Sequence, residues 1–167
     1  EEIGAIQNWN PDRNELANEP VSEDYIAVIQ MPDYNMHPDW KGTPESSKDF
    51  VWRKGLRFLR LYQLKAVKCL QLAVSEGKDR FLFEMATGTG KTLTSAAVIR
   101  LILRTKNARK VLFLVARLEL EDQAWKAFTN YLKPDYSTYI FKEHRSDWRN
   151  ADIVVTTIQS LMFDNKY

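Results

Sequence analysis

The sequence predicts an α/β fold in which helices flank a parallel sheet, and three observations lead to this class. Apolar runs typical of strands alternate with helical patterns from residue 56 onward. A glycine-rich segment, residues 85–92, separates one such run from the next helix. The apolar run 111–115 is continuous, as in a strand covered on both faces. Strands that alternate with helices at this spacing favour parallel pairing with right-handed crossovers.

The first 50 residues differ in character from the rest. They hold five of the six prolines and many Asn, Asp and Glu residues, and their one long apolar run, 25–31, is compatible with a strand. This composition is typical of an extended linker or a peripheral arm. We therefore predict an irregular N-terminal arm or inter-domain linker over residues 1–50 and an α/β domain over residues 51–167.

The remaining elements follow from apolar spacing and from stop signals. Helices are expected over residues 56–74, 91–104 and 118–131, and strands over residues 81–84, 111–115, 138–141 and 153–156. Gly77 and Pro134 supply helix stop signals. Ligands of such sheets bind at the carboxyl ends of the strands, which is where the glycine-rich segment falls.

Composition bounds the function classes. An apolar content of 44% and a charged content of 28% are ordinary for a globular domain, and 167 residues are enough for a core. The net charge of +2 is too small to indicate nucleic-acid binding without local basic patches. One cysteine allows no intrachain disulfide. No apolar run approaches the roughly 18 residues of a membrane span. We expect a cytoplasmic protein without a membrane segment.

Residues 85–92, Met-Ala-Thr-Gly-Thr-Gly-Lys-Thr, predict a phosphate-binding loop. Gly88 and Gly90 can take positive φ, so backbone N–H groups can approach the phosphates. The first turn of the following helix adds its own unpaired donors. Lys91 would reach the β- and γ-phosphates, and the Thr92 hydroxyl would ligate Mg²⁺. The usual pattern begins with glycine, whereas this segment begins with methionine.

The segment Thr-Gly-Thr-Gly-Lys-Thr also resembles motif I of the superfamily 2 helicases and translocases, and companion motifs follow it in order. Upstream, residues 59–67 resemble the adenine-reading Q-type motif, with Gln63 placed 28 residues before Lys91. A glutamine amide offers a donor and an acceptor, which matches the adenine edge. The alternative is a glutamine on the exposed face of an amphipathic helix.

Two downstream segments, residues 111–123 and 153–161, resemble motifs Ia and Ib. Arg117 would lie at the carboxyl end of its strand, where the resemblance places a nucleic-acid backbone. It could instead pair with Glu121 at i+4. The hydroxyls of Thr156 and Thr157 would donate to phosphate oxygens, or cap the next helix.

Residues 52–60 form the densest basic patch of the sequence. In a helix, Arg53, Arg57 and Arg60 would fall on one face. Arginines interleaved with aromatic residues fit contact with a nucleic-acid strand or with a nucleotide. A solvated helix face is the alternative, except for Arg60, which belongs to the Q-type motif.

The amino-acid sequences of these motifs most resemble those of the motor (restriction) subunit of type I restriction enzymes, over residues 56–162. This resemblance implies a RecA-like P-loop NTPase domain with ATP and Mg²⁺ as cofactors and double-stranded DNA as substrate. It also implies modification and specificity subunits as partners, and a full-length enzyme that is an ATP-dependent translocase and site-specific deoxyribonuclease. Those subunits usually carry an acidic residue where this chain has Ala116.

The resemblance also assigns roles to single residues. The expected nucleotide contacts are Arg60, Gln63, Thr87, Gly88, Thr89, Gly90, Lys91 and Thr92. Lys91 and Thr92 are the expected catalytic residues, and Arg117, Thr156 and Thr157 the expected nucleic-acid contacts. No zinc site is indicated, because the histidines are far apart and the cysteine has no metal-type spacing.

The Asp-Glu pair with which this superfamily organises Mg²⁺ and activates water does not occur after Thr157, where Asp164 is the only acidic residue. We therefore expect residues 51–167 to be an incomplete motor domain that binds ATP without useful hydrolysis. Other readings stay open: a superfamily 2 helicase acting on RNA or in DNA repair, or a non-catalytic nucleotide-binding module. A small-molecule kinase would leave the resemblance to motifs Ia and Ib unexplained.

Overall fold

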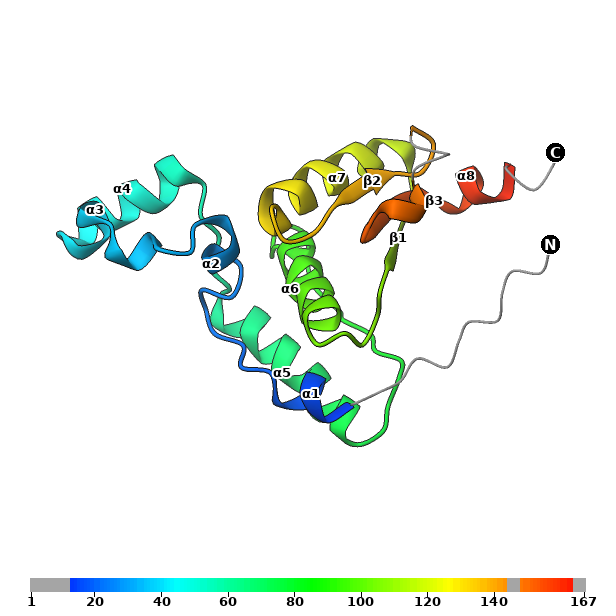
Figure 1. Ribbon diagram of the computed structural model, residues 1–167, viewed down its shortest axis with the longest axis horizontal. Helices are drawn as coiled ribbons and strands as arrows, with labels where there is room; N and C mark the ends of the chain where they lie inside the picture. Colours follow the sequence, from blue (N-terminus) through cyan, green and yellow to red (C-terminus); the bar gives the residue numbers. More distant parts are fainter. Residues whose placement is uncertain (1–12, 144–147, 164–167) are drawn as a thin grey trace.

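Three parallel strands form the sheet of the computed structural model, which describes residues 13–143 and 148–163 (Figure 1). Their order is β1-β3-β2, with β1 at Val111–Val115, β2 at Thr138–Ile140 and β3 at Ile153–Thr157. Helices α5 (Leu61–Ser75), α6 (Lys91–Arg104) and α7 (Leu118–Leu132) accompany them, and α8 (Ile158–Phe163) follows β3. The predicted α/β class with a parallel sheet is confirmed. The extreme ends of the predicted arm and domain, 1–12 and 164–167, lie outside the described residues.

The prediction of a strand over residues 81–84 is wrong. The backbone there forms no regular ladder, and the side chain of Leu82 is 93% exposed. A strand exists only where a neighbour pairs with its N–H and C=O groups. Within the described part of the chain, β1 pairs with β3 and with no strand on its other edge. The segment before the glycine-rich loop therefore remains extended but unpaired.

Strand β1 also differs from its prediction, because only one of its faces is covered. Phe113 packs against the core, whereas Leu112 and Leu114 on the opposite face are exposed. Alternate residues of a strand point to opposite faces, so an uninterrupted apolar run here means one buried face and one open apolar face.

Helix boundaries explain why the basic patch is not one surface. Helix α4 (Pro44–Lys54) ends at Gly55, which has a left-handed backbone with φ +64°, and α5 begins only at Leu61. Arg53 therefore lies in α4, while Arg57 and Arg60 lie in the extended connection. The prediction that these arginines share one helical face is wrong, because a left-handed glycine ends the helix between them.

The N-terminal region is helical rather than extended. It contains α1 (Arg13–Asn18), α2 (Ala27–Gln30), η1 (Tyr34–Met36), α3 (Pro38–Lys41) and α4. The expected strand over residues 25–31 is replaced by α2, where Met31 N–H donates to the Ala27 carbonyl at 2.9 Å. The apolar run is thus buried by a local helical turn, which satisfies its own backbone.

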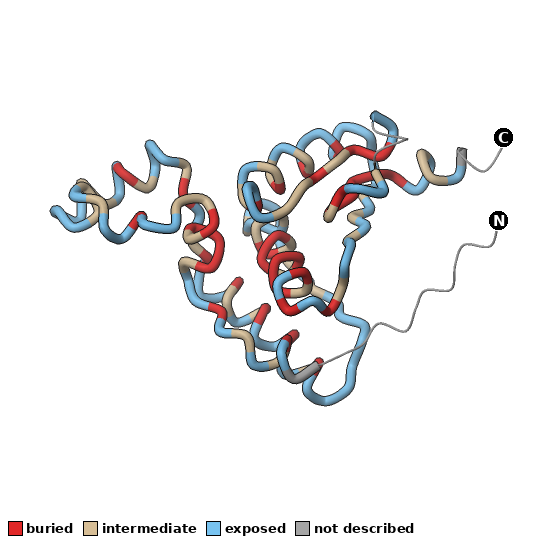
Figure 2. Tube along the Cα trace, viewed as in Figure 1, coloured by how far each residue is buried: buried red, intermediate tan, exposed pale blue. Residues whose placement is uncertain are grey.

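Residues of this region belong to the main core. Leu16, Tyr25, Ile26 and Ile29 are buried in the same apolar cluster as residues of α5, α6, α7 and β3. Figure 2 shows the buried stretches of α2 and α6 in red. The buried guanidinium of Arg100 on α6 donates to the Tyr25 carbonyl and lies 4.1 Å from the centroid of its ring. The predicted boundary near residue 50 stays a prediction, and these contacts cross it.

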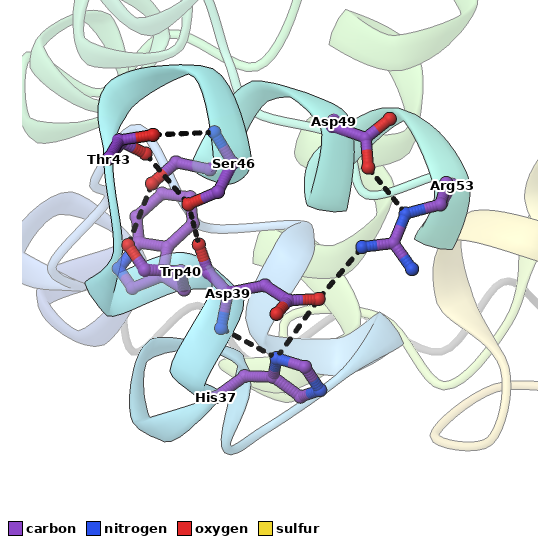
Figure 3. A network of polar contacts seen from close by, with 8 residues as sticks. His37, Asp39, Trp40, Thr43, Ser46, Asp49 and Arg53 are labelled. Carbon is purple, nitrogen blue, oxygen red and sulfur yellow. Dashed lines mark hydrogen bonds and ion pairs between the residues drawn. The ribbon is translucent and has the colours of Figure 1, made fainter.

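Side-chain contacts join α3 to α4 (Figure 3). Arg53 bonds to Asp39 at 2.8 Å and to Asp49 at 2.6 Å, so its charge is compensated within this region. The His37 ring accepts from the Asp39 N–H at 3.2 Å and caps α3. Ser46 Oγ donates to the Asp39 carbonyl at 2.8 Å. The pairing of Arg53 favours a structural role for this arginine.

In the described part of the chain, no helix has the length and apolarity of a membrane span.

Tyr34 gives this region a pH dependence. Its burial, together with a 2.9 Å hydrogen bond from its hydroxyl to Asp24, raises the pKa of Tyr34 to about 12. A raised tyrosine pKa favours the neutral, folded form, so this contribution is complete below pH ~10 and is lost as the pH rises toward 12. Between pH ~10 and 12, the free energy of unfolding should therefore fall less in Tyr34→Phe than in the parent, as measured by urea denaturation at each pH. Equal losses would contradict the assignment.

Candidate nucleotide-binding site

The predicted phosphate loop connects an extended segment to the first turn of α6. Gly88 and Gly90 have φ of +79° and +82°, in the left-handed region that favours glycine. The Thr89 hydroxyl donates to the Ala86 carbonyl at 2.7 Å and closes the turn. Among the residues that the structure describes, no side chain caps the start of α6, which leaves the N–H groups of its first turn without a side-chain partner there. Such a terminus favours anions.

The Lys91 ammonium group lies over this loop. Its Nζ is 3.3 Å from the Ala86 carbonyl and 3.4 Å from the Met85 carbonyl, and the side chain is exposed. Thr92 is the next residue of α6 and is half-buried. One loop and one helix start thus bring together the predicted phosphate contacts from Thr87 to Thr92. Flexible glycines, open N–H groups and a lysine fit a polyphosphate, and a hydroxyl fits one ligand position of a phosphate-bound Mg²⁺.

Gln63 lies against this loop and is only 2% exposed, so it is not on the open face of α5. Its Oε1 accepts from the Arg60 N–H at 2.9 Å, which caps α5. Its Nε2 donates to the carbonyls of Thr89 and Gly90, both at 3.1 Å. Packing of α5 beside α6 brings the Q-type motif to the loop. The adenine-reading role of Gln63 and the nucleotide contact of Arg60 stay predictions.

Tyr62 also contacts the loop, although its position in the sequence did not predict this. Its hydroxyl donates to the Thr89 carbonyl at 2.7 Å and accepts from the Arg60 guanidinium at 3.3 Å. The only signal in the sequence was its place beside Gln63 at the start of α5. Consecutive helical residues rarely share a target, so the pattern did not predict that both reach the same carbonyl.

Arg117 lies where the sequence predicted, immediately after β1 and at the N-terminus of α7. Its side chain is exposed and forms no ion pair within the described residues. The alternative pairing with Glu121 is not observed, because that buried carboxylate pairs instead with Lys142 at 3.0 Å. An unpaired arginine at the carboxyl end of a strand is available to a phosphate.

Thr156 and Thr157 are fully buried at the end of β3. Thr157 Oγ1 accepts from the Ser160 N–H at 3.1 Å, so the capping role is observed. The register pairs Thr157 with Val115, so Thr157 and Arg117 both lie at the carboxyl ends of their strands, on the same end of the sheet. Direct phosphate contact by either threonine stays a prediction, and it would require each hydroxyl to become exposed.

An apolar cavity of about 320 Å³ lies beside the loop. It separates the extended segment at Phe83 and Met85 from β1, and α6 forms its floor through Val98 and Ile102. Val111 and Phe113 of β1 line its other side. In residues 13–143 and 148–163, no group of three or more His, Cys, Asp or Glu side chains could hold a metal ion.

The chain is similar in sequence to subunits of restriction enzymes. The family model described as type III restriction enzyme, res subunit, matches residues 58–167. The chain is 41% identical over 70 residues to the type I restriction enzyme EcoKI endonuclease subunit of Escherichia coli (strain K12), covering 42% of this chain and 6% of that protein. It is 39% identical over 89 residues to the EcoAI endonuclease subunit of Escherichia coli, covering 50% and 11%.

A third relative covers more of the chain. The probable type III restriction-modification enzyme HindVIP Res subunit of Haemophilus influenzae is 28% identical over 137 residues, or 81% of this chain and 24% of that protein. The chain therefore spans between 6% and 24% of the length of these three relatives. Because the family model covers the glycine-rich loop, the sheet and the helices α5 to α8, the chain belongs to the family of the type III restriction enzyme res subunit.

Proposed function

We propose that this chain is the ATP-binding portion of an ATP-dependent DNA translocase, a restriction subunit that moves duplex DNA before cleavage. The observation that carries the proposal is the loop itself. Two left-handed glycines, the uncapped start of α6 and the Lys91 ammonium converge on one point. Lys91 would neutralise the β- and γ-phosphates of ATP, and Thr92 would ligate Mg²⁺.

The restriction class follows from the relatives, which are named as restriction endonuclease subunits. By analogy, the partners are double-stranded DNA and the modification and specificity subunits of a cytoplasmic complex. Arg117 is the candidate contact to the DNA backbone, because it is exposed at the carboxyl end of β1 and at the start of α7. Contacts of this kind position a duplex without reading its sequence.

The proposal is tested by titrating the full chain with ATP and Mg²⁺ in a calorimeter, with and without duplex DNA. Saturable binding to a single site is expected. Absence of binding to any triphosphate would overturn the nucleotide role. Saturable binding of ATP without any DNA binding at low salt would instead favour a non-catalytic nucleotide-binding module.

Arg117→Ala tests the DNA contact. We expect affinity for duplex DNA to fall about 10-fold at 0.1 M salt, because one charge-assisted phosphate contact is lost. The slope of log affinity against log salt should decrease by about 1. Fluorescence anisotropy with a labelled duplex measures both quantities.

The matched control for this variant is Arg109→Ala, which removes an exposed arginine near the opposite end of β1. Its affinity and salt slope should stay close to those of the parent. If the two variants behave alike, Arg117 makes no specific contact with DNA.

A further inference from the structure

Helix α5 holds the phosphate loop through three hydrogen bonds to two consecutive carbonyls. The Tyr62 hydroxyl donates to the Thr89 carbonyl at 2.7 Å. The Gln63 Nε2 donates to the same carbonyl and to that of Gly90, both at 3.1 Å. The donors lie 26 or 27 residues before the carbonyls they bind. These bonds therefore depend on the packing of α5 against the loop.

A side chain at Gly90 would displace the Gln63 amide from the loop carbonyls. A Cβ added at Gly90 would lie 2.5 Å from Gln63 Nε2, so the end of the Gln63 side chain would have to move. The backbone of Gly90, with φ +82°, already disfavours other residues. Gly90 thus serves two purposes, because it turns the loop and leaves room for the Gln63 amide.

These bonds orient the donors that a phosphate would use. In a planar trans peptide unit the C=O of one residue and the N–H of the next point in opposite directions. Holding the Thr89 carbonyl toward α5 therefore turns the Gly90 N–H away from α5. The Gly90 carbonyl also accepts the first helical bond of α6, from the Thr94 N–H at 3.0 Å, so Gln63 reinforces an orientation of the Lys91 N–H that the helix already favours. A preorganised set of N–H groups binds an anion without an ordering cost.

The Gln63 amide has little capacity left for a nucleobase. Its Oε1 is engaged by the Arg60 N–H, and both hydrogens of its Nε2 are used by the two loop carbonyls. The side chain is 2% exposed. Reading an adenine edge would require this amide to give up bonds that shape the loop.

We propose that Tyr62 and Gln63 are positioning residues that hold the loop in its phosphate-binding shape, independently of the base of the nucleotide. The inference rests on the proposed function, since it concerns how the same loop binds phosphates. If the two residues position the loop, removing either donor weakens the binding of ATP, GTP and inorganic triphosphate by the same factor. If Gln63 reads adenine, its removal weakens the binding of ATP alone.

The experiment measures the affinity of the full chain for ATP, GTP and inorganic triphosphate, each with Mg²⁺, by isothermal calorimetry. Tyr62→Phe removes one hydroxyl and should weaken all three ligands about fivefold. Gln63→Glu replaces the donating amide by an acceptor and should weaken all three by a larger factor, about 30-fold. Tyr131→Phe on α7, distant in sequence from the loop, is the matched control and should change none of them.

The outcomes separate the two proposals. If the parent binds none of the three ligands, the nucleotide role itself fails. If the parent binds the three ligands and both variants, Tyr62→Phe and Gln63→Glu, bind them as tightly as the parent does, the positioning role is overturned. A loss confined to ATP would also overturn it and would assign Gln63 to the adenine. Thermal unfolding of each variant shows whether a uniform loss reflects the loop or loss of the fold.

Discussion

Lys91→Ala is expected to lower the affinity of the chain for Mg·ATP about 100-fold, which is the largest effect on binding that we predict. The ammonium of Lys91 is the cation that lies directly over the loop, 3.3 Å from the Ala86 carbonyl. Removing it leaves the phosphates with N–H dipoles but without a full positive charge. Calorimetry or the fluorescence of a labelled nucleotide measures the loss.

The control is Lys68→Ala, which removes an exposed lysine of α5. Both variants lose one charge, so a general electrostatic effect would weaken them alike. We expect Lys68→Ala to bind Mg·ATP within about twofold of the parent, since an exposed charge outside the site contributes little. Unchanged affinity in Lys91→Ala would exclude this loop as the nucleotide site.

Phe128→Ala is expected to lower the free energy of unfolding by about 3–5 kcal/mol, the largest effect on stability. The Phe128 side chain is fully buried on α7, and its ring meets that of Phe113 edge to face at 4.7 Å. This contact joins α7 to β1, and truncation leaves a cavity that the surrounding elements fill only in part. Urea denaturation followed by circular dichroism gives the change.

Trp52→Ala is the control for this stability prediction. Trp52 is a larger aromatic residue than Phe128, but it is 81% exposed on α4. Its truncation should change the free energy of unfolding by less than about 1 kcal/mol. A comparable loss in the two variants would mean that burial in the described core does not determine which aromatic residues stabilise the fold.

Several elements were predictable because their signals are local. The bounds of α6, Lys91–Arg104, agree with the prediction, since apolar spacing and the preceding glycine both lie within the segment. Strand β1 was predicted over its full length for the same reason. Residues 81–84 failed because a strand needs a neighbour, and apolar composition does not supply one.

In the candidate site too, local features were predictable from the sequence and features that depend on packing were not. The positive φ of Gly88 and Gly90 and the place of Lys91 at the start of a helix were predictable, because spacing within eight residues determines them. The burial of Thr156 and the absence of an Arg117–Glu121 pair were not. Both depend on which elements pack against those residues.

The sequence by itself therefore determined the local shape of the loop, with its two left-handed glycines and the helix that begins at Lys91. Only the tertiary structure decided that Tyr62 and Gln63 act on the loop, because their bonds to Thr89 and Gly90 span 26 or 27 residues. Local periodicity determines the face on which a side chain lies. Its hydrogen-bond partner depends on the packing of α5 beside α6, which periodicity does not encode.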